Sequence, residues 1–418
     1  MNVILKNAKV IDEHSPFNNQ IVDLKIKDGI ITEIASEIAQ HSEYQTVQFS
    51  NLLVSPGWFD SSVSLGEPGF EDRETIANGL LTAGKSGFTA IALQPNTQPT
   101  LDTQSQIYFV KSKAQNHATD LYPIGAFTKN AAGTDMAEMY DMKNAGAIAF
   151  GDYQKSISNA NLLKIGLQYV QDFDGLLLAF AQDATIKGNG VVHEGIVSTT
   201  LGLKGIPPLA EEVEIARLLF LLEYTGGKLH IPTISTEKSV ELIKQAKAKG
   251  LQVSCSVAVH NLVLTDAILT EFDTRAKVLP PVRDEKHRQA LLRGVIDGTI
   301  DLITSDHNPL DIELKKMEFD AAKFGTIGLE SAFAALQTVL PTAVIVEKFT
   351  AGKAIFNIQS NTIQVGQKAC LSLFTDHGQT TFTKQHILSK SKNSIFLNQT
   401  VKGQVYGIYN NKTLLIND

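Results

Sequence analysis

The two ends of the chain share a hydrophobic pattern that the middle lacks. Both ends contain short apolar or alternating runs that are broken by turn residues, which is typical of β-strands. The expected strands are Val3–Val10, Ile21–Ile26, Gly29–Ile34, Cys370–Phe374, Thr380–Phe382, Val401–Tyr409 and Thr413–Ile416. We therefore expect the two ends to form one discontinuous β-rich unit.

In the middle of the chain, strand-like apolar runs alternate with helix-like amphipathic segments. Repeated βα units predict a parallel sheet, either doubly wound or closed as an eight-stranded barrel, and periodicity alone leaves both open. No glycine-rich phosphate fingerprint follows any strand, which disfavours dinucleotide binding. The expected helices are Glu71–Lys85, Met136–Asn144, Ala210–Tyr224, Glu237–Lys249 and Arg288–Ile296, and the strands are Phe88–Leu93, Ala147–Phe150, Leu176–Phe180, Leu229–Ile231, Gln252–Val257 and Ile300–Ser305.

Composition narrows the class of protein. The net charge of −7 disfavours nucleic acid or an anionic membrane as the main partner. Two cysteines, Cys255 and Cys370, are too few for a disulfide framework, and the N-terminus lacks signal-peptide features. No apolar run is long enough for a membrane span. We expect a cytoplasmic protein.

Polar residues that follow the parallel strands are the candidates for chemistry, because βα loops gather at one end of a barrel. Asp306 is the strongest catalytic candidate, as a general base. Asp152 could ligate a metal or cap a helix, and Asn96 could bind a carboxylate or form a turn. His230 and His260 are isolated histidines, which are more often structural than metal ligands.

The usual hydrolase motifs are missing from this sequence. Its ten histidines form no His-x-His, His-x-x-x-His or His-Glu-x-x-His pattern, and there is no Gly-x-Ser-x-Gly elbow. A standard zinc hydrolase is therefore not expected.

A series of short motifs runs in order along nearly the whole chain, and through it the chain resembles dihydroorotase. This family comprises cyclic amidohydrolases of pyrimidine biosynthesis, and the match is to its long, aspartate carbamoyltransferase-associated form. The resemblance implies a (β/α)8 barrel at residues 55–354 and a β-sandwich from residues 1–54 plus 355–418. The motifs include Pro56-Gly57-x-x-Asp60, Glu67-Pro68-Gly69, Gln94-Pro95-Asn96-Thr97, Leu201-Gly202-Leu203, Leu279-Pro280-Pro281-Val282-Arg283 and Ser305-Asp306-His307.

The departures from the family pattern fall on the metal and substrate positions. Serine is a poor zinc ligand, since zinc prefers imidazole, thiolate or carboxylate. Of the family's metal residues only Asp306 is clearly kept, as a vestigial catalytic residue, and Asp152 is the nearest candidate for the bridging position. Of the carboxylate-binding residues, Asn96 is kept, whereas Gly66 replaces an arginine and Leu310 a histidine. The resemblance places Ser62, Ser64, Phe180 and Thr233 at family ligand positions.

Three functional interpretations follow from this pattern. The first is a non-catalytic dihydroorotase-like protein without zinc, which acts as a structural or regulatory partner of aspartate carbamoyltransferase. The second is a cyclic amidohydrolase with an altered or metal-poor site. The third is a module that binds a ligand without turnover. In each, the remaining substrate-binding candidates are Asn96, His230 and His260, and a homodimer is expected.

Overall fold

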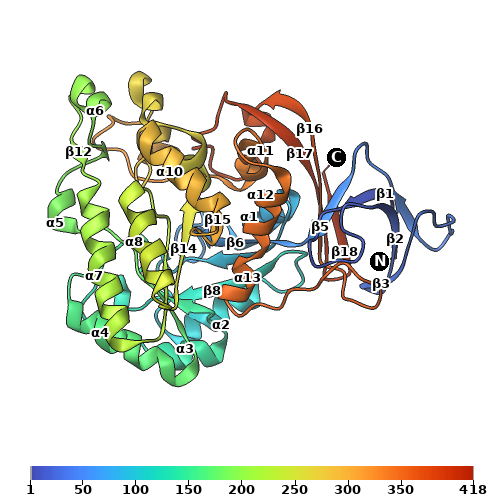
Figure 1. Cartoon of the computed structure of the whole chain (residues 1–418), viewed down its shortest axis with the longest axis horizontal. Coiled ribbons are helices and arrows are strands. Elements are labelled where there is room, and N and C mark those ends of the chain that lie inside the picture. The colour runs from blue at the N-terminus through green and yellow to red at the C-terminus, as the bar shows by residue number, and fades with distance from the viewer. Residues whose placement is uncertain (1, 418) are drawn as a thin grey trace.

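A parallel barrel makes up the larger part of the computed structural model, which describes residues 2–417 (Figure 1). Neighbouring strands pair in parallel in the order β15-β14-β13-β10-β9-β8-β7-β6. A bridge between Val63 and His307 brings the two edges of this sheet together. The strands are β6 (Trp58–Val63), β7 (Phe88–Leu93), β8 (Asp120–Gly125), β9 (Ala149–Phe150), β10 (Leu176–Leu178), β13 (Lys228–Ile231), β14 (Val253–Ala258) and β15 (Leu302–Thr304).

Helices lie between successive strands and cover the outside of the barrel (Figure 1). The predicted alternation of strand and helix is confirmed, and the structure selects the barrel over the open sheet. No helix within residues 2–417 combines the length and apolar character needed to cross a bilayer. The longer helices are α1 (Ile76–Lys85), α2 (Gln104–Lys113), α4 (Ala160–Tyr169), α7 (Leu209–Thr225), α8 (Glu237–Ala248), α10 (Glu285–Ile296) and α12 (Thr342–Thr350).

The two ends of the chain form a second sheet beside the barrel, as the sequence predicted (Figure 1). Its order is β18-β17-β16-β5-β1-β2-β3, and β4 also pairs with β1. The predicted domain boundaries, after residue 54 and before residue 355, stay a prediction. The strands are β1 (Val3–Val10), β2 (Ile21–Lys27), β3 (Ile30–Ala35), β4 (Gln45–Val47), β5 (Leu53–Pro56), β16 (Leu371–Thr381), β17 (Thr400–Asn410) and β18 (Thr413–Ile416).

Several predicted boundaries were wrong. The runs Cys370–Phe374 and Thr380–Phe382 belong largely to one strand, β16, whose register shifts between Thr375 and Gln379. Helix α1 begins at Ile76, not Glu71, because the Thr75 side chain accepts the Asn78 backbone N–H and caps it there. Similarly, the Asp284 side chain caps α10, which starts three residues before the predicted Arg288.

Trp58 joins the barrel to the terminal sheet. Its indole is fully buried and packs at 5.0–5.2 Å between ring centroids against Phe333, Phe349 and Phe374. Trp58 Nε1 donates to Ser55 Oγ at 2.9 Å, and its backbone N–H donates to the Ser372 hydroxyl at 3.0 Å. Strands of both sheets therefore depend on one aromatic cluster, in which aromatic contacts add to the burial of apolar area.

Truncation of this cluster should destabilise the whole chain. Phe374→Ala leaves a cavity beside Trp58, and we expect the free energy of unfolding to fall by about 3–5 kcal/mol. Urea unfolding followed by circular dichroism measures this change. Phe109→Ala is the matched control, because Phe109 is 40% exposed on α2, and it should cost less than about 0.5 kcal/mol. Equal losses for the two variants would contradict the role of the cluster.

Candidate functional site

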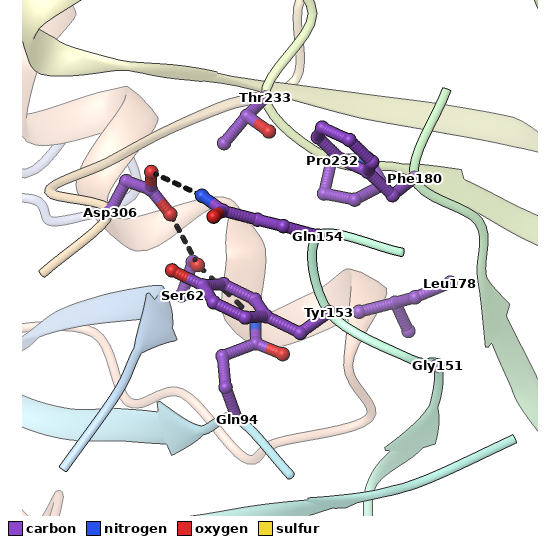
Figure 2. A pocket seen from close by; sticks show the side chains of 10 residues that line it. All are labelled: Ser62, Gln94, Gly151, Tyr153, Gln154, Leu178, Phe180, Pro232, Thr233 and Asp306. Atoms are coloured by element: carbon purple, nitrogen blue, oxygen red, sulfur yellow. Dashed lines mark hydrogen bonds between the residues drawn. The ribbon is translucent and has the colours of Figure 1, made fainter. Parts of the chain in front are cut away.

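The mouth of the barrel, at the carboxyl ends of its strands, contains only a very small cavity (Figure 2). Its volume is about 10 Å³, close to the minimum for one water molecule, whereas small-molecule pockets are typically about 300–1,000 Å³. No lysine, arginine or histidine lines it. The lining residues are Ser62, Gln94, Gly151, Tyr153, Gln154, Leu178, Phe180, Pro232, Thr233 and Asp306.

The polar side chains of the mouth bond to one another (Figure 2). The Ser62 hydroxyl donates to Asp306 Oδ1 at 3.0 Å, and Gln94 Nε2 donates to Ser62 Oγ at 3.2 Å. On the other side of the carboxyl group, Gln154 Nε2 lies 3.4 Å from Asp306 Oδ2. Ser62 therefore serves as a hydrogen-bond link between strands β6 and β7 and the loop after β15.

Burial controls the charge of Asp306. Removal from water raises the pKa of this carboxyl to about 7, the Ser62 hydrogen bond lowers it, and the nearby Asp60 carboxyl raises it. Burial also raises the pKa of Asp60, against hydrogen bonds from Ser305 and Thr304. Burial, together with the charge of Asp306, raises the pKa of the neighbouring Tyr153 hydroxyl. Asp306 therefore keeps a proton at pH values where an exposed aspartate is ionised.

An apolar cluster occupies the opposite side of the mouth. Phe180 is 4% exposed and packs in a cluster with Ile206, Ala210 and Leu279. Phe324 packs against this cluster from outside. The Phe180 ring thus lies where the family resemblance implies a metal-binding imidazole, and it offers no lone pair to a cation.

The residues of the mouth do not fit a zinc ion. Ser64 Oγ donates to Asn96 Oδ1 at 3.0 Å, so neither side chain points freely at the cavity. Both oxygens of Asp152 accept from Thr128, one from its backbone N–H at 3.0 Å and one from its hydroxyl. Asp306 is the one carboxylate left facing the cavity, and zinc sites need three or four N, S or carboxylate ligands.

The two predicted substrate-binding histidines lie outside the lining of the mouth cavity. His230 Nδ1 is 2.9 Å from Ser254 Oγ and its Nε2 is 3.2 Å from Ser256 Oγ, so both nitrogens have partners. Neither ring nitrogen of the buried His260 has a hydrogen-bond partner among the described residues. Burial lowers the pKa of each to about 3, so both are neutral. Asn96 also lies outside this lining, and a substrate role for the three residues stays a prediction.

The two substituted carboxylate-binding positions are closed by packing. A Cβ atom on Gly66 would lie 1.7 Å from the carbonyl oxygen of Phe70, so this backbone admits no side chain at position 66. Gly66 N donates to Glu74 O at 3.0 Å and fixes the tight loop. Leu310 is buried. An arginine at position 66 would therefore require a different backbone conformation of this loop, as well as a different side chain.

Three mouth residues have left-handed backbones without being glycine. The φ angles are +54° for Tyr153, +50° for Thr233 and +48° for Asp306. Such conformations cost of order 1–3 kcal/mol each and cluster at functional sites. The backbone of this mouth is thus built like that of an active site, although its side chains close it.

One group of potential metal ligands lies away from the mouth, at His193, Asp284 and His287, with ligand atoms within 4.8 Å of one another. Arg283 Nη1 lies 3.3 Å from His193 Nδ1, and the backbone N–H of Glu237 donates to His287 Nδ1 at 3.0 Å. Each Nδ1 therefore faces a donor, which leaves the proton of the neutral ring on Nε2. With both Nε2 atoms protonated, the group does not fit a metal ion.

Tyr153 and Gln154 line the mouth although neither was predicted from the sequence. Both directly follow Asp152, beyond strand β9, and their position after a strand was the available signal. The contact of Gln154 with Asp306 spans 152 residues, and no local pattern indicates it.

Comparisons with known proteins agree with the fold and with the earlier resemblance. A family model described as "Dihydro-orotase-like" matches residues 51–239. A protein named dihydroorotase from Pelotomaculum thermopropionicum is 39% identical over 96% of both chains, and one from Acetivibrio thermocellus is 37% identical over 97% of this chain and 96% of its own. Among solved structures, the L-hydantoinase from Arthrobacter aurescens has a TM-score of 0.86 at 22% identity over 100% of this chain and 96% of its own. That likeness supports the fold alone.

The raised pKa of Asp306 predicts a specific pH dependence of stability. The folded protein holds a proton on Asp306 that the unfolded chain releases between about pH 4 and about pH 7, so stability is lost as pH rises through this window. Asp306→Asn removes this loss. We expect the variant to exceed the wild type by up to about 4 kcal/mol at pH 8, with the difference shrinking toward pH 4.

Urea unfolding at pH 4.5, 6 and 8 measures this difference (about 1.4 kcal/mol per unit of pKa shift). Asp135→Asn, at an exposed position, is the control and should show no such trend. A wild type that is more stable than Asp306→Asn at pH 8 would mean that the ionised carboxylate is favourably held.

Proposed function

Because the chain belongs to the dihydroorotase family, we propose that it is a non-catalytic member, acting in pyrimidine biosynthesis as a structural or regulatory partner of aspartate carbamoyltransferase. The observation that carries this proposal is the Ser62–Asp306 hydrogen bond inside a cavity of about 10 Å³. The one retained catalytic-type carboxyl is bonded to a residue at a family ligand position.

Hydrolysis of a cyclic amide needs an activated water and stabilisation of the oxyanion that forms. A metal ion supplies both in this type of chemistry, by lowering the pKa of bound water to about 7 and polarising the carbonyl. The mouth residues do not fit such an ion, and no lysine, arginine or histidine lines the cavity to replace it. Asp306 could accept a proton, but the donors beside it, such as Gln154, are uncharged and polarise a carbonyl group less than a metal ion does.

A second candidate is a cyclic amidohydrolase with a remodelled, metal-poor site. Two observations favour it: the pKa of Asp306 is raised to about 7, which suits a general base, and the mouth keeps three left-handed residues. The cavity would then have to open, with Phe180 and Gln154 moving away, before a cyclic amide could enter. Turnover that is abolished by Asp306→Asn would favour this candidate over the first.

A row of exposed apolar side chains supports the existence of a protein partner. Leu209, Val213, Phe220 and Tyr224 recur at helical spacing along α7 and are 41–78% exposed. Exposed apolar side chains grouped along one helix are often found at protein interaction sites. Aspartate carbamoyltransferase and a second copy of this chain are the two proposed partners.

The protein should neither bind zinc nor hydrolyse cyclic amides. In protein expressed with added zinc, we expect less than about 0.1 zinc per chain, because the mouth lacks the required ligands. We also expect no hydrolysis of dihydroorotate or hydantoin above the rate with Asp306→Asn. Elemental analysis and a spectrophotometric assay measure these quantities. Stoichiometric zinc, or turnover lost in Asp306→Asn, would overturn the non-catalytic assignment.

The proposed partner should bind the intact barrel. Mixed at about 10 μM with aspartate carbamoyltransferase from the same organism, the protein should form a hetero-assembly, seen by light scattering coupled to gel filtration. Phe220→Ser with Tyr224→Ser should weaken this assembly by about tenfold or more, since exposed aromatic residues often dominate interfaces. Tyr108→Ser, at a 53% exposed tyrosine on α2, is the matched control. Failure of the wild-type proteins to associate would contradict the partner proposal.

A further inference from the structure

A pocket lined by lysines lies on the loops beyond the barrel mouth. We call it the lysine pocket and define it by Lys187, Lys204, Lys277 and Lys323, with the Phe324 ring in its wall. These lysines come from the segments that follow β10, β14 and β15, at the carboxyl end of the barrel. The volume is about 460 Å³, within the usual range for small-molecule sites.

The charge of this pocket is unbalanced. Asp320 is the single acidic residue in its lining, and within residues 2–417 none of the four lysines forms an ion pair with a carboxylate. The chain as a whole carries a net charge of −7, so a local excess of positive charge runs against the overall balance. Converging like charges repel one another unless an anion lies between them.

Lys277 is the anchor of the pocket. It is only 2% exposed, and its Nζ donates to the carbonyl oxygens of Phe319 and Asp320 at 2.8 and 2.9 Å. An ammonium group has three protons, so one donor remains after these two bonds. A buried cation with a spare donor is a typical element of an anion site.

Phe324 brings two of the cations together. The Nζ atoms of Lys277 and Lys187 lie 5.0 and 5.4 Å from the centroid of its ring. Burial lowers the pKa of Lys277, the Asp320 charge raises it, and the charges of Lys187 and Lys323 lower it. An anion bound among these groups would reduce the repulsion between the lysines.

We propose that the lysine pocket binds a small polyanion that carries a phosphate or pyrophosphate group. The positive charges that line this pocket exceed what one carboxylate balances, and lysine is a common phosphate binder that acts as a point charge. Phe324 lines the lysine pocket and packs against the apolar cluster that contains Phe180, so the ligand binds outside the closed mouth. The site is independent of whether the barrel is catalytic.

Calorimetric titration of the full chain with sodium pyrophosphate tests this site, at an ionic strength held constant with NaCl. We expect saturable binding of one pyrophosphate per chain, accompanied by a rise in melting temperature. Lys187→Gln combined with Lys323→Gln should weaken binding by about tenfold or more, since charge-assisted contacts are lost. Lys402→Gln, an exposed lysine on β17, is the matched control and should bind as the wild type does.

Three results would overturn the proposal. Binding that is absent at constant ionic strength, or unchanged in the double variant, would remove the site. Citrate that binds as tightly as pyrophosphate would overturn the assignment to phosphate. A glutamate-rich peptide that binds where pyrophosphate does not would assign the surface to an acidic protein segment.

Discussion

Closure of the barrel is the constraint on which the rest of the structure depends, and Asp60 makes that closure. Its buried carboxyl on β6 accepts hydrogen bonds from the Thr304 hydroxyl and from the backbone N–H of Ser305 at 2.9 Å, both at the end of β15. Two further bonds continue the seam: Ser62 Oγ to Asp306, and Ser64 N to His307 O at 2.7 Å. The Ser62 side chain and the Ser64 backbone thus extend a structural join between the first and last strands.

The hydrogen-bonded seam accounts for several features of the mouth together. A buried carboxyl without a neighbouring cation has a raised pKa. Short hydroxyl side chains can donate hydrogen bonds to this carboxyl while occupying little volume. Phe180 packs in an apolar cluster and closes one side of the mouth. The left-handed backbones of Tyr153, Thr233 and Asp306 persist because the surrounding barrel determines them. The scaffold is therefore that of a hydrolase, with its polar groups directed at one another.

The fold could be predicted from the sequence because its signals are local, whereas much of the site could not. Alternating βα segments and the strand-rich ends predicted a parallel sheet and the terminal sheet, and the family resemblance implied the barrel. Ser62, Ser64 and Asp306 were found from their places in short motifs. The predicted start of α1 was wrong because the Thr75 cap, and not the amphipathic periodicity, determines where the helix begins. Tyr153, Gln154 and the lysine pocket depend on loops far apart in the chain, and periodicity carries no information about such contacts.

The position of Trp58 gives this protein an internal optical reporter. It is the only tryptophan in the chain, and it lies where the barrel meets the terminal sheet, distant in sequence from the Phe333 and Phe374 rings that it contacts. Its fluorescence emission therefore reports on the packing where these two parts meet. Rearrangements confined to the outer loops should leave this emission unchanged. Any ligand or partner that changes this emission must act through the junction between the sheets.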